Sequence, residues 1–377
     1  MRRPLIVLDA LLLRPHPTGV GRAIIEWTRA LAAEDHGLDF AVLCTHAELL
    51  PDLQDRPGWQ LVPCPGAVGG MLRKAAWTQF VMPGTLRRLG ADLMHSLQFV
   101  APLVPPCPTV VTVHDLGYLR FPETIEEPRR TYYRTLVPPS LRRAGAVVCN
   151  SAATADDVRQ RFPAVAQRVD VTPFGTPSWV QEQPPVESHR APDAPFLFVG
   201  TLEPRKNLER LLMAYQDFTQ SREKRGLSAP RLVLVGGRGW KDSRLRDILA
   251  SLTESGQVIV KDYCGPQELW EQYKLARALL FPSLHEGFGF PILEAMVAGL
   301  PVLTSDDGAM AEVAGDAALK VDSHDQQALT ACMERLVDEP SLCEDLVKRG
   351  QQRWMSWTWA KTARSTVEIY RRLLARS

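Results

Sequence analysis

Short runs of aliphatic and β-branched residues alternate with helical patterns along most of the chain. Runs of this kind, bounded by polar or glycine-containing loops, are typical of strands buried on both faces of a parallel sheet. Between them, apolar residues recur at helical spacing, as at Leu208, Leu211, Leu212 and Tyr215. Because strands alternate with helices, we predict an α/β protein with doubly wound sheets. The predicted strands lie within PLIVLDALLL (4–13), TVVTVHD (109–115), AVVCNS (146–151), FLFVGT (196–201), RLVLVGG (231–237), ALLFPS (278–283) and PVLTS (301–305).

The length of 377 residues exceeds what one hydrophobic core usually serves, so we expect two domains. A proline-rich stretch with little periodicity, PSWVQEQPPVESHRAPDAP at 177–195, is the best candidate for the linker between them. Ligands of open α/β sheets bind beyond the carboxyl ends of the strands. We therefore expect the functional residues in loops that follow strands, on either side of a cleft between the two domains.

Composition excludes several classes of protein. Hydrophobic residues make up 45% and charged residues 23% of the chain, as in globular proteins. The net charge of +1 gives the chain no strong positive potential that would attract nucleic acid. No apolar segment approaches the roughly 20 residues of a membrane span, and Asp9 interrupts the apolar run near the N-terminus, so we expect no secretory signal. The seven cysteines include no C-x-x-C pair, which favours a reducing, cytoplasmic location without disulfides or structural zinc.

One segment is markedly basic. Residues 60–150 contain ten Lys and Arg but five Asp and Glu, a local charge of +5. Within it, GGMLRKAAWTQFVMPGTLRRLG at 69–90 combines basic and apolar side chains, a combination that can bind an anionic membrane surface. The alternative is an amphipathic helix that only packs on a sheet. The residues that we assign to the membrane-facing surface are Arg73, Lys74, Arg87 and Arg88, with Met71, Trp77 and Phe80 among them.

The stretch SLHEGFGFPILEAMVAGLPVLTS at 283–305 places Glu286 before a glycine loop and Glu294 on the helix that we expect to follow. Pro291 suits the first helical position and Gly299 the C-terminal cap. The glycines let the backbone approach a ligand, and the helix N-terminus attracts phosphate. Each carboxylate can accept hydrogen bonds from sugar hydroxyls. This arrangement predicts a nucleoside diphosphate sugar as the ligand, whereas a surface loop with two unrelated glutamates is the alternative.

Two basic residues point to the same ligand. Arg205 and Lys206, in FVGTLEPRKNLERLLMAY at 198–215, are predicted to lie at the start of a helix near Asn207. A helix N-terminus disfavours cations, so their position is explained if the diphosphate of the ligand shares the site. A solvent-facing basic pair is the alternative.

The first half of the chain carries two weaker signals. PTGVGRAIIEW at 17–27 reads as a glycine loop that opens a helix. It is a poor dinucleotide fingerprint, but its backbone at Gly19 and Gly21 can approach a diphosphate. His114 follows a predicted strand, where Asp115 can orient its ring. Taken alone, a histidine in such a place is more often structural than catalytic.

Together, these motifs resemble those of retaining glycosyltransferases of family 4, which have the GT-B fold. The resemblance rests on Glu286-x7-Glu294 and on five segments spread nearly from end to end: TGVGRAIIEWTRAL (18–31), VTVHDLGYLRFPE (111–123), VVCNSAATADDV (147–158), GTLEPRKN (200–207) and SWTWAKTA (356–363). It implies two doubly wound, Rossmann-like domains that face each other across a cleft. Residues 1–180 would form an N-terminal acceptor domain, to which a C-terminal helix at about 358–377 returns, and residues 181–357 a nucleotide-sugar domain. The likeness is greatest to bacterial mannosyltransferases of O-antigen and exopolysaccharide assembly.

The resemblance also implies a role for each site residue. Glu294 would bind the ribose, and Glu286 would bind hydroxyls of the donor sugar. Lys206 and Arg205 would neutralise the diphosphate, and His114 would lie near the transferred sugar. The expected catalytic residues are His114, Glu286, Lys206 and Arg205. The other expected contacts with the donor are the backbone at Gly19 and Gly21, the loop residues Gly287, Phe288, Gly289 and Phe290, the base contacts Tyr263 and Cys264, and Thr201, which replaces an arginine of some relatives.

The expected function is transfer of a hexose with retention of anomeric configuration. We expect no cofactor and no metal, because no Asp-x-Asp pair follows a strand and SDD at 305–307 is a weak candidate. By resemblance, front-side attack by the acceptor hydroxyl would pass its proton to the leaving phosphate. The first choice of donor is GDP-mannose, before UDP- and dTDP-sugars. The expected acceptor is a saccharide, lipid-linked at the inner face of the cytoplasmic membrane, or else soluble. The alternatives are a sugar-nucleotide epimerase, an NAD-dependent oxidoreductase and a non-catalytic binder of sugar nucleotides.

Overall fold

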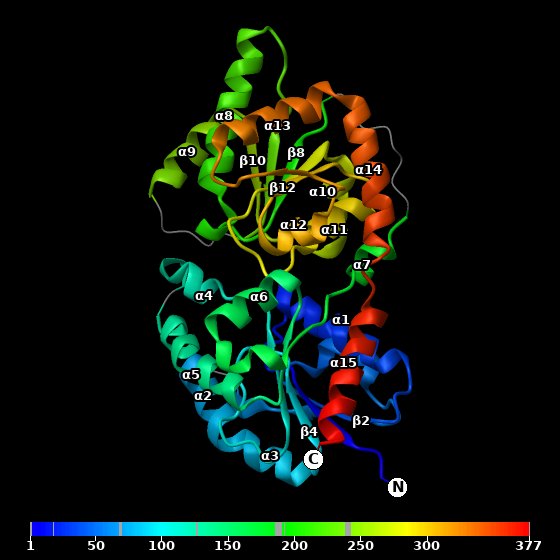
Figure 1. Ribbon diagram of the computed structural model, residues 1–377. Coiled ribbons are helices and arrows are strands. Elements are labelled where there is room, and N and C mark those ends of the chain that lie inside the picture. The colour runs from blue at the N-terminus through cyan, green and yellow to red at the C-terminus, as the bar shows by residue number, and fades with distance from the viewer. Residues whose placement is uncertain are drawn as a thin grey trace. The chain divides into compact units, whose positions relative to one another are not determined.

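The computed structural model describes residues 2–17, 19–67, 70–125, 127–184, 191, 193–237 and 243–376. The chain forms two compact units: unit 1 comprises Met1–Gly175 and Thr358–Ser377, and unit 2 comprises Thr176–Trp357. Each is a parallel sheet with helices on both faces (Figure 1).

The first junction between the units lies after Gly175, ahead of the boundary expected at residue 180. The stretch at 177–195, predicted as a linker, is therefore assigned to unit 2. Within it, Ser178–Gln181 forms α7, and residues 185–190 and 192 lie outside the described residues.

The sheet of unit 1 has seven parallel strands in the order β3-β2-β1-β4-β5-β6-β7. The strand order reverses between β1 and β4, because β2 lies on one side of β1 and β4 on the other. Asp9, the last residue of β1, pairs in register with Ser96, the last residue of β4, so these two strands end at the same level. The strands are β1 (Leu5–Asp9), β2 (Asp39–Cys44), β3 (Trp59–Pro63), β4 (Leu93–Ser96), β5 (Thr109–Val113), β6 (Ala146–Cys149) and β7 (Val169–Val171).

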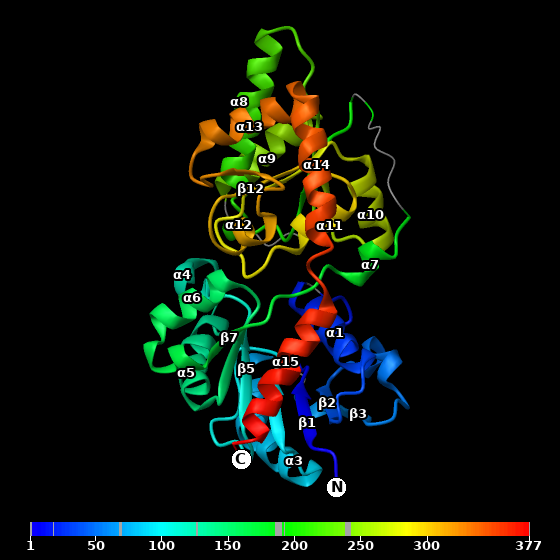
Figure 2. The ribbon, with the colours of Figure 1, turned by 45° about the vertical axis from the view of Figure 1, so that its right-hand side comes forward.

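The C-terminal helix α15 (Trp359–Leu374) packs along α1 (Gly19–Ala33) and so returns to unit 1 as predicted (Figures 1 and 2). Trp27 on α1 donates a hydrogen bond to Thr366 on α15 over 2.9 Å. The fully buried ring of His95 on β4 bonds Tyr370 of α15 over 2.6 Å and Thr112 of β5 over 2.8 Å. The C-terminal helix is therefore part of the core of unit 1.

The remaining helical elements of unit 1 are α2 (Met71–Ala76), the π-helical turn η4 (Trp77–Val81), α3 (Met82–Leu89), α4 (Gly117–Arg120), α5 (Arg129–Arg143), α6 (Ala152–Arg161) and the 3-10 turns η1 (Ala47–Leu49), η2 (Pro51–Leu53), η3 (Pro65–Ala67), η5 (Pro122–Thr124) and η6 (Pro163–Arg168).

The elements α2, η4 and α3 follow one another without a break and form one long helix. Trp77 lies three positions after the inward-facing Lys74 and is buried in the core, and Met71 is half-buried against the core, so assigning Trp77 and Met71 to the membrane-facing surface was wrong. The outward-facing apolar side chains are instead Leu72, which is 77% exposed, and Phe80, which is 83% exposed, with Val81 beside them. Arg73, Arg87 and Arg88 are exposed on the same helix, as predicted.

The sheet of unit 2 has six parallel strands in the order β10-β9-β8-β11-β12-β13, which reverses between β8 and β11. The strands are β8 (Phe196–Val199), β9 (Leu232–Val235), β10 (Val258–Lys261), β11 (Ala278–Phe281), β12 (Val302–Ser305) and β13 (Leu319–Val321). The helices are α7 (Ser178–Gln181), η7 (Pro204–Lys206), α8 (Leu208–Lys224), α9 (Ser243–Glu254), α10 (Pro266–Leu275), α11 (Phe290–Val297), α12 (Gly308–Ala314), α13 (Gln326–Asp338) and α14 (Pro340–Trp354).

Each of the seven runs predicted as strands contains a buried parallel strand: β1, β5, β6, β8, β9, β11 and β12. Most of these strands end before the predicted run does, and the extra residues lie in the loops at the carboxyl ends. No helix among the described residues has both the length and the apolar character needed to cross a membrane.

Candidate functional site

The strand reversal of unit 2 brings the main predicted site residues together. Ligands of open α/β sheets bind at such a reversal, beyond the carboxyl ends of the strands. Arg205 and Lys206 follow β8, and Glu286 follows β11, the strand that pairs with β8. Lys206 and Glu286 therefore meet although they are 80 positions apart in the chain.

The two cations lie in the short 3-10 turn η7, directly before α8, which starts at Leu208 with Asn207 as its N-cap, close to the start that the sequence predicted. Asn207 separates η7 from α8 and adopts a left-handed conformation with φ of 60°. Its amide donates to the carbonyls of Pro282 (3.0 Å) and Ser323 (2.7 Å). Asn207 thereby fixes the β8 loop to the end of β11, a positioning role that the sequence did not suggest.

Arg205, Lys206 and Glu286 form one ion-paired cluster. Arg205 Nη1 donates to Glu286 Oε2 over 3.0 Å, and Lys206 Nζ bonds Glu286 Oε1. The Lys206 ammonium also lies 5.2 Å from the centre of the Phe281 ring, at the end of β11. Lys206 and Glu286 are each only 9% exposed. The sequence predicted separate roles for the cations and the carboxylate, whereas the structure shows that each holds the other in place.

The electrostatics of the cluster keep Glu286 ionised. Burial alone would raise the pKa of Glu286, but the charges of Arg205 and Lys206 outweigh burial and lower it to about 2. A carboxylate with this pKa accepts hydrogen bonds at any physiological pH and does not donate a proton. Arg205 is held from a second side by Glu203 Oε1 at 2.7 Å, which fixes the plane of its guanidinium.

The glycine loop between Glu286 and α11 is tightly packed. Gly289 has a φ of +108°, which an L side chain rarely adopts, and a Cβ there would lie 3.2 Å from Ile292 Cδ1. The ring of Phe288 is buried against Phe290 (5.1 Å between ring centres) and Trp357 (5.3 Å). Gly287 is buried as well. Packing thus fixes the conformation of residues 287–290, and their backbone contact with a ligand stays a prediction.

Glu294 lies inside α11 and is 3% exposed. The hydroxyl of Tyr273, a fully buried residue on α10, donates to Glu294 Oε2 over 2.7 Å. This bond orients the carboxylate that the sequence assigned to the ribose. Tyr273 was missed because an aromatic residue on the buried face of a helix looks the same in sequence whether it packs only or also donates a hydrogen bond.

Three further predicted residues lie at the same edge of the sheet. Thr201 is exposed just after β8, and Tyr263 (49% exposed) and half-buried Cys264 follow the edge strand β10. Between them, the loops after β8 and β9 touch: a Cβ on Gly236 would lie 2.0 Å from the carbonyl oxygen of Gly200. A side chain at residue 236 would clash with this carbonyl, so glycine is required at the contact between the two loops.

In unit 1, His114 follows β5 and is 3% exposed. Its Nε2 lies 2.9 Å from the carbonyl oxygen of Leu97, and because a carbonyl only accepts, Nε2 carries the proton. Burial lowers the pKa of His114, so the ring is neutral. Nδ1 is then an acceptor, buried and without a hydrogen-bond partner among the described residues, between the rings of Phe99 and Phe174.

The structure gives Asp115 another task than the one predicted. Its carboxylate accepts the backbone N–H of Gly117 over 2.8 Å and so stabilises the turn that begins α4, while Leu97 orients the His114 ring. Gly19 is the first residue of α1, as the sequence predicted for the glycine loop. A Cβ on Gly21 would lie 3.0 Å from Pro17 Cβ, so this turn is closely packed.

Comparison with known sequences accounts for both units. Residues 180–353 match the family described as Glycosyl transferases group 1, and residues 17–177 match Glycosyltransferase Family 4. The chain is 31% identical over 271 residues to O-antigen chain mannosyltransferase B of Escherichia coli, covering 70% of each protein. The chain belongs to glycosyltransferase family 4.

This family 4 glycosyltransferase is also 28% identical over 290 residues to the serotype-specific mannosyltransferase WbdA of Escherichia coli. That match covers 72% of the chain but 34% of WbdA, which is a much longer protein. Among solved structures, the fold is similar to sucrose-phosphate synthase from Thermosynechococcus elongatus, with a TM-score of 0.75, 20% identity and full coverage of both chains. The two parallel-sheet units are those of the GT-B fold, as predicted.

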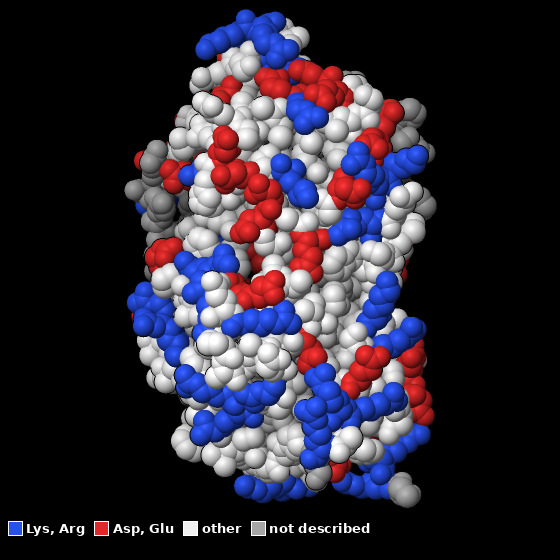
Figure 3. Space-filling view, in the orientation of Figure 1, with Lys and Arg blue, Asp and Glu red and all other residues white. Residues whose placement is uncertain are grey.

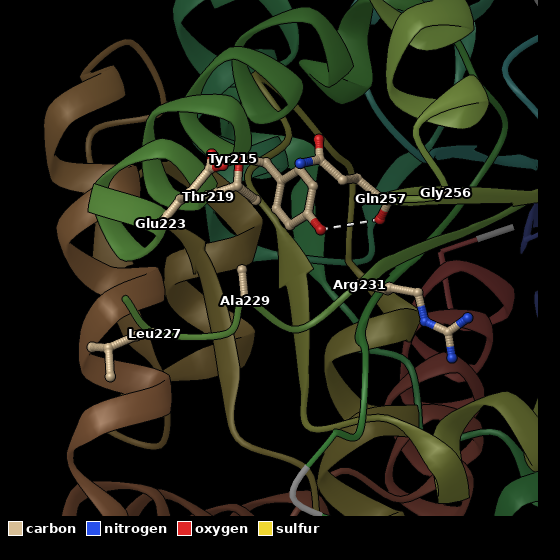
Figure 4. Close-up of a pocket in the computed structure, with 8 residues that line it drawn as sticks. All are labelled: Tyr215, Thr219, Glu223, Leu227, Ala229, Arg231, Gly256 and Gln257. Carbon is tan, nitrogen blue, oxygen red and sulfur yellow. Dashed lines mark hydrogen bonds between the residues drawn. The ribbon is translucent and has the colours of Figure 1, made fainter. Parts of the chain in front are cut away.

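A pocket of about 250 Å³ in unit 2 of the glycosyltransferase lies away from this site (Figure 4). Arg231 and Gln257 on its rim immediately precede β9 and β10, and Tyr215 lines it from α8. The pocket is therefore at the amino ends of the strands, on the opposite edge of the sheet from Lys206. The described residues contain no group of three or more His, Cys, Asp or Glu side chains that could hold a metal ion, and metal independence stays a prediction.

Proposed function

We propose that this glycosyltransferase transfers a hexose from a nucleotide sugar to a saccharide acceptor with retention of anomeric configuration. The observation that carries the proposal is the buried cluster of Arg205, Lys206 and Glu286 at the strand reversal of unit 2. Mannose from GDP-mannose is the first choice of donor, which the mannosyltransferase relatives support.

The cluster suits a reaction in which negative charge builds on a leaving nucleoside diphosphate. Lys206 and Arg205 are already held in position, so little reorganisation accompanies the growth of that charge. Removing one preorganised stabiliser of this kind typically costs about 100-fold or more in turnover. In our proposal these two cations supply the stabilisation that a metal ion supplies in other transferases.

Neither of the other two candidate catalytic groups acts as a proton donor in this scheme. Glu286 is ionised, so it accepts hydrogen bonds from hydroxyls of the donor sugar. His114 donates its only N–H to Leu97, so its Nδ1 accepts a hydroxyl as well. The proton of the attacking acceptor hydroxyl then passes to an oxygen of the leaving phosphate, as a new glycosidic bond forms on the same face from which the phosphate departs.

A panel of nucleoside diphosphates in thermal-shift assays tests the donor. We expect GDP to raise the melting temperature more than UDP or dTDP does. NMR of the product from the matching sugar nucleotide then reports the anomeric configuration. A larger shift with UDP or dTDP would exclude GDP-mannose, and an inverted product would exclude the retaining reaction. A non-catalytic binder would give a shift with no release of nucleoside diphosphate.

We also propose that the acceptor is lipid-linked and that the enzyme meets it at an anionic membrane surface, through the exposed face of the helix at residues 71–89. Leu72 and Phe80 lie on this face, and Arg73, Arg87 and Arg88 flank them. Lys and Arg side chains also gather on the visible face of unit 1 in Figure 3. Each basic residue near anionic lipid contributes about 1 kcal/mol, and apolar side chains add to this by insertion.

Sedimentation with liposomes tests the docking surface. The protein should bind anionic liposomes at low salt and leave them at high salt. Changing Arg73, Arg87 and Arg88 together to Ser should abolish binding, and changing Leu72 and Phe80 to Ser should weaken it, while nucleotide binding is unchanged. Equal binding to neutral and anionic liposomes, or binding to neither, would favour a soluble acceptor.

A further inference from the structure

The strand reversal of unit 1 also holds a charged network, which the reaction described above does not use. Asp9, at the end of β1, is fully buried. Its Oδ1 accepts the N–H of Leu11 over 3.0 Å, and its Oδ2 accepts the amide of Gln98, just beyond β4. The Gln98 carbonyl in turn accepts Lys74 Nζ over 2.6 Å. Lys74 from α2 is thus turned inward, which corrects its assignment to the membrane-facing surface.

More positive charge surrounds this network than Asp9 balances. Arg14 in the loop after β1 and Arg129 at the start of α5 are both close enough to Lys74 to lower its pKa. The pKa of Lys74 is about 8, because burial lowers it, Asp9 raises it and the two arginines lower it further. Among the residues that the structure describes, neither arginine has a carboxylate partner. The positive charge of Lys74 alone balances the negative charge of Asp9. The structure of this network therefore does not require the charges of the two arginines.

Two side chains on α5 prepare the surroundings for a ligand. Arg129 is held by Tyr133, whose hydroxyl lies 3.3 Å from its Nε and whose ring centre lies 5.5 Å from its guanidinium carbon. Tyr132 is 9% exposed, and its buried hydroxyl has no hydrogen-bond partner in the described part of the chain. The Tyr132 ring lies beside that of Tyr133, with 5.5 Å between the ring centres, and Tyr132 is near enough to Asp9 for the Asp9 charge to raise its pKa in addition to burial. A free donor beside surplus cations is the environment that a phosphate oxygen requires.

We propose that Arg14, Lys74 and Arg129 bind a phosphate or diphosphate group carried by the acceptor, with the Tyr132 hydroxyl as a further donor. The site lies where ligands of doubly wound sheets bind, beyond the ends of β1 and β4. This inference rests on the proposed function for its assignment to the acceptor. The predicted substrate class is a phosphorylated saccharide, either soluble or attached through diphosphate to a lipid.

Binding of inorganic pyrophosphate, measured by calorimetry, tests the site directly. The donor site is first disabled by Arg205→Ala with Lys206→Ala, so that the remaining binding reports unit 1. In this background we expect pyrophosphate to bind, and Arg14→Ala with Arg129→Ala to weaken the binding at least about 10-fold, since charge-assisted bonds are lost. Both arginines are exposed, so these changes leave the fold intact. Arg143→Ala, at the other end of α5, is the matched control and should change nothing.

The proposal is overturned if disabling the donor site abolishes all pyrophosphate binding, or if the Arg14 and Arg129 changes leave it unaltered. Farnesyl diphosphate, used in monomeric form, then distinguishes a lipid-linked diphosphate from a soluble phosphorylated saccharide as the ligand. Affinity at least about 10-fold above that of pyrophosphate, lost with Leu72→Ser and Phe80→Ser, identifies a lipid-linked acceptor. Equal affinity identifies a soluble one. None of these measurements needs a donor, so failure of the donor panel leaves this result standing.

Discussion

The two strand reversals of the molecule hold their charges differently. In unit 2, Glu286 is bonded directly to Arg205 and Lys206, and Glu203 also pairs with Arg205, so two carboxylates balance two cations. In unit 1, Asp9 reaches Lys74 only through the Gln98 amide, and the surplus arginines remain exposed. A compensated cluster can respond to charge that changes during a reaction, whereas an uncompensated one attracts an anion of constant charge. The difference suits a leaving diphosphate in unit 2 and a phosphate of the acceptor in unit 1.

The largest effect should follow from breaking the compensated cluster. Lys206→Ala should lower turnover at least about 100-fold, because one preorganised stabiliser of the leaving group is lost. The release of nucleoside diphosphate at saturating donor measures this. Lys224→Ala, an exposed position at the end of α8, removes the same charge without touching the cluster. Turnover near that of the wild type, in a folded Lys206→Ala protein, would remove the phosphate role of this residue.

The second prediction uses acid to separate the two units. Burial, and to a lesser degree His114, lowers the pKa of His95 to about 3. An unfolded histidine titrates near 6.5, so the unfolded chain gains a proton first and unit 1 loses stability as the pH falls below about 6.5. Between pH 7 and pH 5 the loss from His95 is about 2 kcal/mol, a factor of roughly 30 in the folding equilibrium. Glu286, with a pKa of about 2, gives unit 2 no such loss in this range.

Calorimetric unfolding at pH 7 and pH 5 tests this difference. Between pH 7 and pH 5, the unfolding transition of unit 1 should lose more stability than that of unit 2 in the wild type. His95→Gln should reduce the loss in unit 1. Some acid sensitivity should remain in the variant, because burial lowers the pKa of His114 too. The matched control is His324→Gln, an exposed histidine of unit 2. An identical pH dependence in wild type and His95→Gln would show that His95 does not make unit 1 acid-sensitive.

The third prediction compares the two glutamates. Glu286→Gln should lower turnover at least about 10-fold, because its partner is the sugar that becomes cation-like in the transition state. It should leave binding of nucleoside diphosphate unchanged or tighter, because the cations lose a competing anion. Glu294→Gln should instead weaken that binding about 10-fold with little effect on turnover at saturation, since a ribose contact acts in the ground state as well. If nucleoside diphosphate binds Glu286→Gln much more weakly than Glu294→Gln, the two roles are reversed.

The parts of this molecule that the sequence predicts well are local. Buried strands such as β8 and β11 appear as short apolar runs, and the glycine loop before Glu294 contains its own turn and helix signals. The strands that were not predicted are β2, β3, β4, β7, β10 and β13. The edge strands β3, β7, β10 and β13 have at most one buried residue each, whereas the internal strands β2 and β4 are buried, and the apolar run DFAVLC of β2 was overlooked.

The contacts that the sequence does not predict depend on strand order. The bond between Lys206 and Glu286 exists because β8 pairs with β11, and the bond between Asp9 and Gln98 because β1 pairs with β4. The burial of Trp77 follows the ordinary helical period, because Trp77 lies on the same face as Met71 and Lys74. The membrane assignment failed there because it took residues from both faces of the helix as exposed.

The smallest predicted effect concerns how unit 2 orients Glu294, and two buried tyrosines make the test a matched one. Tyr273→Phe removes the hydroxyl that bonds Glu294, and Tyr215→Phe removes one that bonds the carbonyls of Pro230 (2.8 Å) and Gln257 (3.0 Å) at the opposite edge of the sheet. Each change should cost about 1 kcal/mol of stability. Only Tyr273→Phe should also weaken nucleoside diphosphate binding, by roughly 5-fold, because only its partner is a proposed ligand contact.

In a double variant with Glu294→Gln the Tyr273 change should add no further loss of affinity, since the two act through one bond. Additive losses, or equal losses in the two tyrosine variants, would mean that Tyr273 supports the fold and not the nucleotide.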